Sequence, residues 1–349
     1  MKRADPLRFR HRSLQTVARA FLVIAATLGL PAQVQSNPYL PRPGEPTLKI
    51  RVATCAVSAG FIHLYTALEH NLFEKYGFKM EHVYIRGRAS SLAALVADEI
   101  QFLYCAADAT LPSLAAGTDA KLVAAPLAKL PFVLVTRKEI RRVEDLKGKS
   151  LGVVRAGDMS DRLSRLLVTK LNIPDVTLRP VGGSQSERFH AMAANIVQGI
   201  VIAPPLDVRA KDEGYNIIYR LIDLDVPFIY SSLHASAPTI RDRPEVVQRV
   251  VAGLAEALNY ADSHPAKAKR AIAKVMRIKD EEALRVAYNV YTQEIVDRRM
   301  HVPGAAVAEA VELYRSLGLP VKRKPEDIYD NSFVSHLEKS GFQRELWSR

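Results

Sequence analysis

The sequence predicts an α/β protein of two lobes, each built on an open, mostly parallel sheet. From residue 48 to about residue 136, strand-like apolar runs alternate with helix-like segments at short spacing. The same alternation starts again at about residue 137, and only helix-like segments follow residue 236. Strands that alternate with helices in this way pair in parallel through right-handed crossovers. The chain has 349 residues, 48% of them hydrophobic, so it is long enough to bury two cores.

The first 36 residues have the pattern of a cleavable export signal. A segment with five Lys and Arg residues precedes the apolar run FLVIAATLGL at residues 21–30, which is too short to cross a bilayer. Small residues then suit a cleavage site before Asn37. We therefore expect a periplasmic protein, with a retained N-terminal anchor helix as the alternative.

The charge of the chain does not indicate nucleic acid as a partner. The net charge of +12 becomes +7 without residues 1–36, which hold six Lys or Arg and one Asp. The remaining basic residues are interleaved with acidic ones instead of forming a stripe. A basic surface favours anionic partners and solubility but does not identify a ligand.

Two cysteines, Cys55 and Cys105, lie near the ends of predicted strands. An exported protein can form a disulfide, but two thiols do not make a disulfide framework. Neighbouring parallel strands place side chains in a geometry that strains the bond. We expect two buried free thiols, with a bridge as the alternative.

The predicted first lobe begins with a β-branched run that suits a strand buried on both faces. Helix-like spacing of apolar residues follows it, and Gly77 marks the end of that helix. Ser90 and Ser91 are candidate caps of the next helix. The expected strands are KIRVATCAV, KMEHVYIR, IQFLYCAA and AKLVAAPL, and the helices between them are residues 61–72, LAALVAD and TLPSLAAG.

The second lobe repeats this order, and the chain then returns to the first. The expected elements are a strand in DLKGKSLGVV, a helix over 160–171, a strand in VTLRPVG, a helix over 186–194, a strand in GIVIAPP and the segment LDVRAKDEGY. Crossovers near residues 134–138 and 228–236 would form a hinge. The predicted domains are residues 37–136 with 229–349, which include the C-terminal helices, and residues 137–228.

Ligands of open parallel sheets collect beyond the carboxyl ends of the strands, near helix N-termini. Arg155 is the sharpest candidate, because a guanidinium beside a helix N-terminus suits a sulfonate or carboxylate. Its alternative is an exposed arginine paired with Asp158 or Asp161. Phe61 and Tyr230 could cover an apolar part of the ligand, with core packing as the alternative. The predicted ligand-binding residues are Ser58, Gly60, Phe61, Arg88, Asp108, Thr110, Arg155, Asp158, Met159, Ser160, Ser184, Pro204 and Tyr230.

Motifs for catalysis, metals and nucleotides are not supported. The triplet Gly148-Lys149-Ser150 lacks the upstream glycine of a phosphate loop and opens a strand where that loop opens a helix. The sequence has no hydrolase elbow or zinc-protease motif. His63 and His234 lack partners at catalytic or metal-ligand spacing, so packing is the better interpretation. We expect no cofactor, no metal and no catalytic residue.

Several segments, taken in order, resemble one family of binding proteins. They are LEHNLFEKYGF, RGRASSLAALVADEIQF, AAGTDAKLV, VEDLKGKSLGV and MAANIVQGIVIAPP, within residues 48–262. They resemble the ABC-importer solute-binding proteins of the sulfonate, nitrate, taurine and thiamine-pyrimidine-precursor type. The resemblance implies a type II periplasmic binding fold, a small-molecule solute, a membrane permease as partner and a monomer. Asp98–Gln101 and Asn195–Gly199 depart from the family pattern in turns that lead into strands.

The function predicted from the sequence is therefore capture of a small anionic organic solute, sulfonate-like, carboxylate-like or pyrimidine-like, by closure of an interlobe cleft. An enzyme on the same fold, with menaquinone-type or thiamine-precursor chemistry, is one alternative. The export signal and the absence of a cysteine-rich motif argue against it. A ligand-sensing module that reports to a membrane partner is the other alternative.

Overall fold

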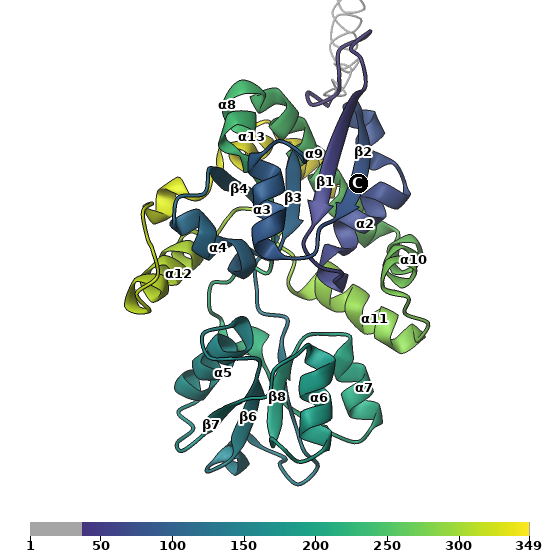
Figure 1. The fold of residues 1–349 in the computed structure, drawn as a ribbon. Helices are drawn as coiled ribbons and strands as arrows, with labels where there is room; N and C mark the ends of the chain where they lie inside the picture. The colour runs from purple at the N-terminus through teal and green to yellow at the C-terminus, as the bar shows by residue number, and fades with distance from the viewer. Residues whose placement is uncertain (1–36, 349) are drawn as a thin grey trace, which may run out of the picture. The chain divides into compact units, whose positions relative to one another are not determined.

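The computed structural model describes residues 37–348, so the predicted signal peptide lies outside the described residues. From Tyr39 onward the chain forms one compact unit. It contains two five-stranded sheets, coloured by position along the chain in Figure 1.

The first sheet has the strand order β2-β1-β3-β10-β4. β1 pairs in parallel with β2 and β3, whereas β10 is antiparallel to both β3 and β4. Four strands therefore share one direction, and the reversed strand is the one that returns from the second sheet. The strands are β1 (Leu48–Thr54), β2 (Phe78–Tyr84), β3 (Phe102–Cys105), β4 (Ala120–Leu127) and β10 (Ser231–Ser236).

The second sheet repeats this arrangement with the order β7-β6-β8-β5-β9. β6 is parallel to β7 and β8, and β5 is antiparallel to β8 and β9. Here too the reversed strand is the one that arrives from the other sheet. The strands are β5 (Val133–Thr136), β6 (Ser150–Val153), β7 (Thr177–Pro180), β8 (Gly199–Ile202) and β9 (Asn216–Arg220).

Helices cover both faces of the first sheet, because successive side chains of a strand point to opposite faces. In β1, Val52 joins the core beneath α2 (Ile62–Glu69), α9 (Pro244–Ser263) and α10 (Pro265–Met276). Its neighbour Ala53 joins the core beneath α3 (Arg88–Val96), α4 (Ala107–Ala115) and α12 (Gly304–Ser316). We call this sheet and its helices the first lobe.

The second sheet is covered in the same way and forms the second lobe. In β5, Leu134 packs beneath α5 (Met159–Lys170), while Val135 packs beneath α6 (Gln185–Ala193) and α7 (Leu206–Asp212). The remaining short helices are η1 (Ala59–Phe61), η2 (Leu72–Tyr76), η3 (Val143–Leu146), η4 (Leu221–Leu224), α8 (Ala237–Asp242), α11 (Glu281–Asn289), the π-helical η5 (Val290–Glu294), η6 (Pro325–Asp327), α13 (Ser332–Lys339) and α14 (Phe342–Trp347).

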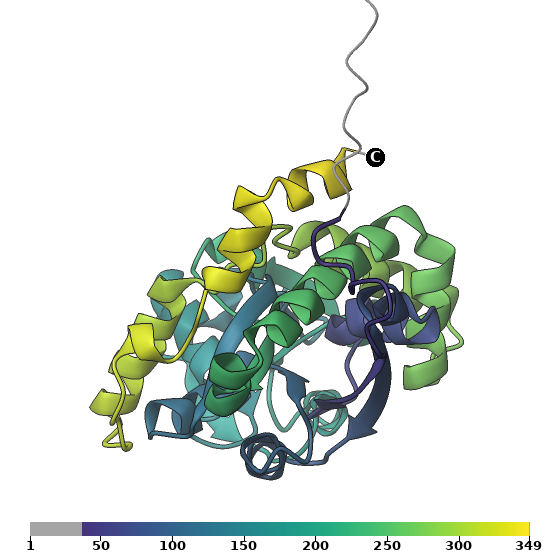
Figure 2. The same cartoon turned by 90° about the horizontal axis from the view of Figure 1, so that it is seen from above.

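The C-terminal helices belong with the first lobe. α13 and α14 pack against α9, and Figure 2 shows this yellow C-terminal segment beside the green α9. Phe333 and Leu337 of α13 enter the same core as the buried face of α9. The segment therefore packs as part of the first lobe.

The predicted fold class is confirmed, but the boundary between the lobes was placed too late. Residues 133–136 were assigned to the first lobe, whereas they form β5 in the second sheet. The links between the sheets are consequently residues 128–132 and 221–230, earlier than the predicted crossovers at 134–138 and 228–236. A four-residue strand that is buried throughout shows no alternation of polar and apolar residues, so its start was not visible in the sequence.

Candidate functional site

The loop after β1 brings Ser58 and Gly60 against Tyr230. The Ser58 hydroxyl caps η1 by accepting from the Gly60 N–H at 3.1 Å and lies 3.5 Å from the Tyr230 hydroxyl. A Cβ on Gly60 would lie 2.2 Å from the Tyr230 ring, so only glycine fits here. Phe61 is buried, with its ring 5.4 Å from that of Tyr104. Phe61 is thus a packing residue, which was the alternative interpretation.

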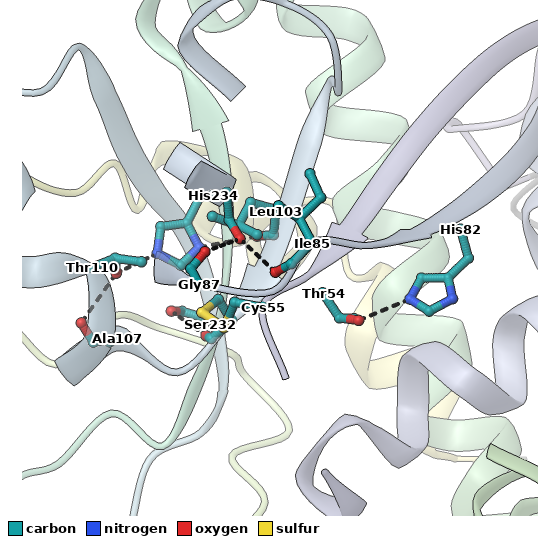
Figure 3. The surroundings of a disulfide bond; sticks show 12 residues. Thr54, Cys55, His82, Ile85, Gly87, Leu103, Ala107, Thr110, Ser232 and His234 are labelled. Carbon is teal, nitrogen blue, oxygen red and sulfur yellow. Dashed lines mark hydrogen bonds between the residues drawn. A yellow bond between two sulfur atoms is a disulfide. The ribbon is translucent and has the colours of Figure 1, made fainter. Parts of the chain in front are cut away.

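Thr110 lies in the core of the first lobe and not at its surface. Its hydroxyl is 2.8 Å from Nε2 of His234, and both side chains are fully buried (Figure 3). Burial lowers the pKa of His234 to about 4, so the ring is neutral near pH 7. Nδ1 donates to the Leu103 carbonyl at 3.0 Å, which leaves Nε2 to accept from Thr110. Thr110 therefore has an internal partner in the core, and a ligand contact at Thr110 stays a prediction.

Cys55 and Cys105 form a disulfide, which corrects the expectation of two free thiols (Figure 3). Their Cα atoms are 5.5 Å apart, inside the usual range for a bridge. The regular pairing of β1 with β3 ends at Thr54 and Tyr104, so Cys55 lies just beyond it. The strain expected from two paired strands does not apply there. The bridge ties the loop that carries Ser58 to the start of α4.

Asp158 and Ser160 hold the start of α5. Asp158 accepts from the Asp161 N–H at 3.0 Å and from the Ser160 hydroxyl at 2.7 Å. The Ser160 hydroxyl also accepts from the Val154 N–H at 2.8 Å. These predicted site residues act first as a cap that fixes the turn after β6.

Arg155 is exposed in this turn. The alternative that it pairs with a nearby aspartate does not hold, because Asp158 caps the helix and Asp161 binds Arg165 at 2.9 Å. Among residues 37–348, no ion pair with Arg155 is present. Its guanidinium is therefore available to solvent at the carboxyl end of the second sheet.

Arg188, on α6, is a buried cation that the sequence interpretation missed. Ser184 and Glu187 form a capping box at the start of α6, and Arg188 follows one turn from the cap. The Arg188 side chain is only 6% exposed, and it donates to the Val201 carbonyl at 3.3 Å. Burial lowers its pKa, and the nearby Asp158 opposes that shift. Two cations, one buried and one exposed, thus lie near the strand ends of the second lobe.

A pocket of about 240 Å³ lies between α4 and α12 of the first lobe and α5 and residues 226–229. Asp108 of α4 and Met159 of α5, both predicted, line it, with Arg162 and Tyr314. The Arg162 guanidinium is 3.7 Å from Asp108 and 3.5 Å from the Tyr314 hydroxyl. The other walls are apolar except for Glu309. We call this the interlobe pocket; it suits a small organic molecule with one polar end.

Tyr230 and Tyr291 connect the two lobes. Their rings stack 5.5 Å apart, and their hydroxyls are 3.3 Å from each other. The Tyr291 hydroxyl donates to the carbonyl of Pro204, at the end of β8, at 3.0 Å. The path from Ser58 through the two tyrosines to Pro204 is therefore continuous.

The predicted residues thus fall into separate groups. Asp108 and Met159 meet in the interlobe pocket, and Ser58, Gly60, Tyr230 and Pro204 meet along the tyrosine path. Arg155, Asp158, Ser160 and Ser184 lie at the end of the second sheet, and Phe61 and Thr110 lie in the core. Arg88 begins α3, but its side chain is outside the described part of the structure.

Arg162 and Tyr314 were missed. Arg162 lies one turn beyond Asp158, so helical spacing alone could have indicated it. Tyr314 comes from a helix more than 150 positions away, and no local pattern links it to the site.

Within residues 37–348, no cluster of His, Cys, Asp and Glu could hold a metal ion. In the same range, no helix has the length and apolar character that crossing a membrane requires.

Comparisons with known proteins agree with this fold. A family model described as NMT1/THI5 like matches residues 58–268. A relative from Brucella abortus, provisionally named a binding protein, is 24% identical over 215 residues, which cover 61% of this chain and 66% of the relative. The match thus spans just under two thirds of the relative's own length.

Solved structures of sulfonate-binding proteins are similar in fold. The periplasmic aliphatic sulphonate binding protein SsuA from Escherichia coli has a TM-score of 0.69 and 19% identity, and the match covers 82% of this chain and 99% of that one. The alkanesulfonate-binding protein SsuA from Xanthomonas axonopodis pv. citri, bound to MOPS, has a TM-score of 0.61 and 18% identity. This match also covers 82% of this chain and 99% of that one. At these identities the likeness shows the fold.

Proposed function

Since residues 58–268 match its family model, the chain belongs to the NMT1/THI5-like family, and we propose that it is the periplasmic solute-binding receptor of an ABC importer. In this proposal it binds and does not catalyse. The solute is a small organic anion with an apolar body, and the partner is a permease that recognises the closed form. The receptor acts as a monomer after export.

The observation that carries this proposal is the interlobe pocket. Arg162 comes from the second lobe, Asp108 and Tyr314 come from the first, and all three meet in one small space whose other walls are apolar except for Glu309. A guanidinium beside apolar walls matches a sulfonate or carboxylate on a hydrocarbon body. The sulfonate-binding neighbours add support through their fold.

The position of these residues on both lobes explains why a bound solute would favour the closed form of the protein. A solute held by Arg162 on one side and by Tyr314 and the walls of α4 and α12 on the other has contacts with both lobes. It therefore binds the closed form better than the open form and shifts the equilibrium by that difference. The Asp108–Arg162 pair, with 3.7 Å between the guanidinium and the carboxylate, bridges the same two lobes.

The buried cation of the second lobe, Arg188, interacts with the cap of α5. Arg188 lies close enough to Asp158, the cap of α5, for the two charges to interact. In this proposal the pair fixes the turn from which α5 presents Arg162 to the solute. Arg155, exposed at the same end, attracts the anion during approach.

A ligand screen followed by two arginine variants tests the function. The full chain is screened by thermal shift with alkanesulfonates, carboxylates and pyrimidines, and hits are measured by calorimetry. Arg162→Ala is expected to raise the dissociation constant at least about tenfold, because it removes a charge-assisted hydrogen bond. Arg165→Ala is the matched control on the same helix, because the Arg165 side chain is exposed and does not line the interlobe pocket; affinity should stay within about twofold.

Three outcomes would contradict the proposal. Binding that is equal in Arg162→Ala and Arg165→Ala would place the solute elsewhere. Chemical conversion of a bound solute would make the protein an enzyme. No hit from any of the three ligand classes, with folded protein, would remove the receptor function as stated.

A further inference from the structure

A second cavity, of about 230 Å³, lies on another side of the junction between the lobes. It is bounded by residues 130–133, α7 and β9 of the second lobe, and α11 and η5, which pack with the first lobe. We call it the hinge cavity, because residues 130–132 of its lining belong to the first link between the sheets. None of its lining residues lines the interlobe pocket.

The hinge cavity has apolar walls and three charged side chains. Pro131, Val286 and Val290 are among the apolar residues of its walls. The charged residues that line it are Asp207, Arg220 and Glu294, which sum to one negative charge when all are ionised. Arg220 and Glu294 pair with each other, which leaves Asp207 as the charged side chain available to an occupant.

Asp207 presents an oxygen whose hydrogen bonding is incomplete. Its side chain is 9% exposed, and its buried Oδ1 has no hydrogen-bond partner within residues 37–348. A buried carboxylate oxygen without a hydrogen-bond partner lowers the stability of the folded protein unless a donor reaches it. Arg220, which also lines the cavity, forms an ion pair with Glu294 and not with Asp207. Burial also raises the pKa of Asp207, a shift that a bound cation would oppose.

The cavity borders the π-helical segment η5. Val290 and Glu294 of η5 face the cavity, and Tyr291 between them donates to Pro204, which also lines the cavity. A π-helical turn is rare and often occurs at functional sites. An occupant here would contact the element that joins the two lobes through Tyr291.

From this geometry we infer that the hinge cavity is a second binding site, for a small primary ammonium compound with a short alkyl body. Its ammonium group donates to the Asp207 carboxylate, and its alkyl chain lies against Val286 and Val290. A bare metal ion suits the space less well, since most of the wall offers no oxygen. The site is independent of the solute in the interlobe pocket. Because its walls come from both lobes, occupancy changes the equilibrium between their arrangements.

Methyl-labelled NMR of the full chain tests this site without any solute of the interlobe pocket. The probe is n-butylammonium chloride, with sodium butyrate as a probe of similar shape and opposite charge. Saturable shifts of the Ile222, Val286 and Val290 methyl signals are expected with n-butylammonium and not with butyrate. Equal or stronger saturable shifts with butyrate, or no saturable shifts with n-butylammonium, would overturn the assignment.

Variants separate a site at Asp207 from general attraction of cations. Asp207→Asn is expected to raise the n-butylammonium dissociation constant about tenfold or more, because it removes the charge-assisted hydrogen bond. Asp212→Asn is the matched control, since Asp212 is exposed on the same helix α7 and lies outside the cavity. Val286→Phe fills the cavity and should abolish the shifts even if Asp207→Asn folds poorly. Equal affinities of Asp207→Asn and Asp212→Asn, or unchanged binding in Val286→Phe, would refute the site.

Discussion

The two lobes have the same sheet plan but use polar residues differently at the ends of their strands. In the first lobe, Thr110 and His234 are buried and satisfy each other, and a disulfide fixes the loop after β1. In the second lobe, Arg155 is exposed, and Ser184 caps an exposed turn. The first lobe thus joins its strand ends through buried side chains and a cross-link, whereas the second lobe holds its strand ends through helix caps. The predictions below test that difference.

Among the features compared, the disulfide of the first lobe should contribute most to the unfolding free energy. Replacing Cys55 and Cys105 together by serine removes a cross-link over a separation of 50 residues. The chain-entropy relation gives a loss of about 4 kcal/mol in unfolding free energy for a loop of that size. Urea unfolding of the variant and of the reduced wild type measures it. A loss under about 1 kcal/mol in both would show that the first lobe does not depend on its bridge.

His234 should make the first lobe sensitive to acid. Burial lowers its pKa from 6.5 to about 4, so the unfolded chain takes up the proton below pH 6.5 while the folded chain does not. The contribution to the unfolding free energy is therefore complete above pH 6.5 and falls by about 3 kcal/mol as the pH drops through about 4. The His234→Gln variant should show a shallower fall in urea midpoints over this range.

The matched control for His234 lies in the second lobe. His190 is exposed on α6, so His190→Gln makes the same substitution outside any core and should change the unfolding free energy at pH 7 by less than about 0.5 kcal/mol. An equal slope in wild type and His234→Gln would show that the buried ring is not the source of acid sensitivity.

Gly60 tests the contact between the first loop and Tyr230. Gly60→Ala places a Cβ 2.2 Å from the ring, so the ring or the loop must move. The expected loss of stability is about 1–3 kcal/mol. In a Tyr230→Leu background the same change should cost much less, which a double-mutant cycle measures. Additive effects would mean that the loop gives way without involving Tyr230.

Ser184 should give the smallest effect. Ser184→Ala removes the capping box of α6 and is expected to cost about 1 kcal/mol, with faster hydrogen exchange in the first turn of that helix. Ser186→Ala, on the exposed first turn of the same helix, is the control and should cost less than about 0.5 kcal/mol. Equal costs would show that the second-lobe turn does not depend on its cap.

Elements with a strong pattern were predictable from the sequence. The buried run of β1, the Asp158 cap of α5 and the repeat that starts after residue 137 all follow local rules of composition and spacing. These rules were enough for the α/β class, the two sheets and the strand ends where a site should lie.

What was missed depends on contacts between distant segments. Tyr314 reaches Arg162 from α12, and Tyr291 reaches Pro204 from η5. Thr110 follows a strand end as a site residue would, but His234 on β10 binds it inside the core. The position of a side chain relative to a far segment is set by tertiary packing, which the alternation of strands and helices does not encode.

The central claim is that the interlobe pocket holds a small organic anion through Arg162. Native mass spectrometry of the wild type, purified gently from the periplasm of its own cells, tests it most directly when followed by denaturation and identification of any released molecule. The account predicts a stoichiometric anionic adduct in the wild type and in Arg165→Ala, and its loss in Arg162→Ala. An adduct retained equally in Arg162→Ala, or a released molecule without an anionic group, would contradict the account.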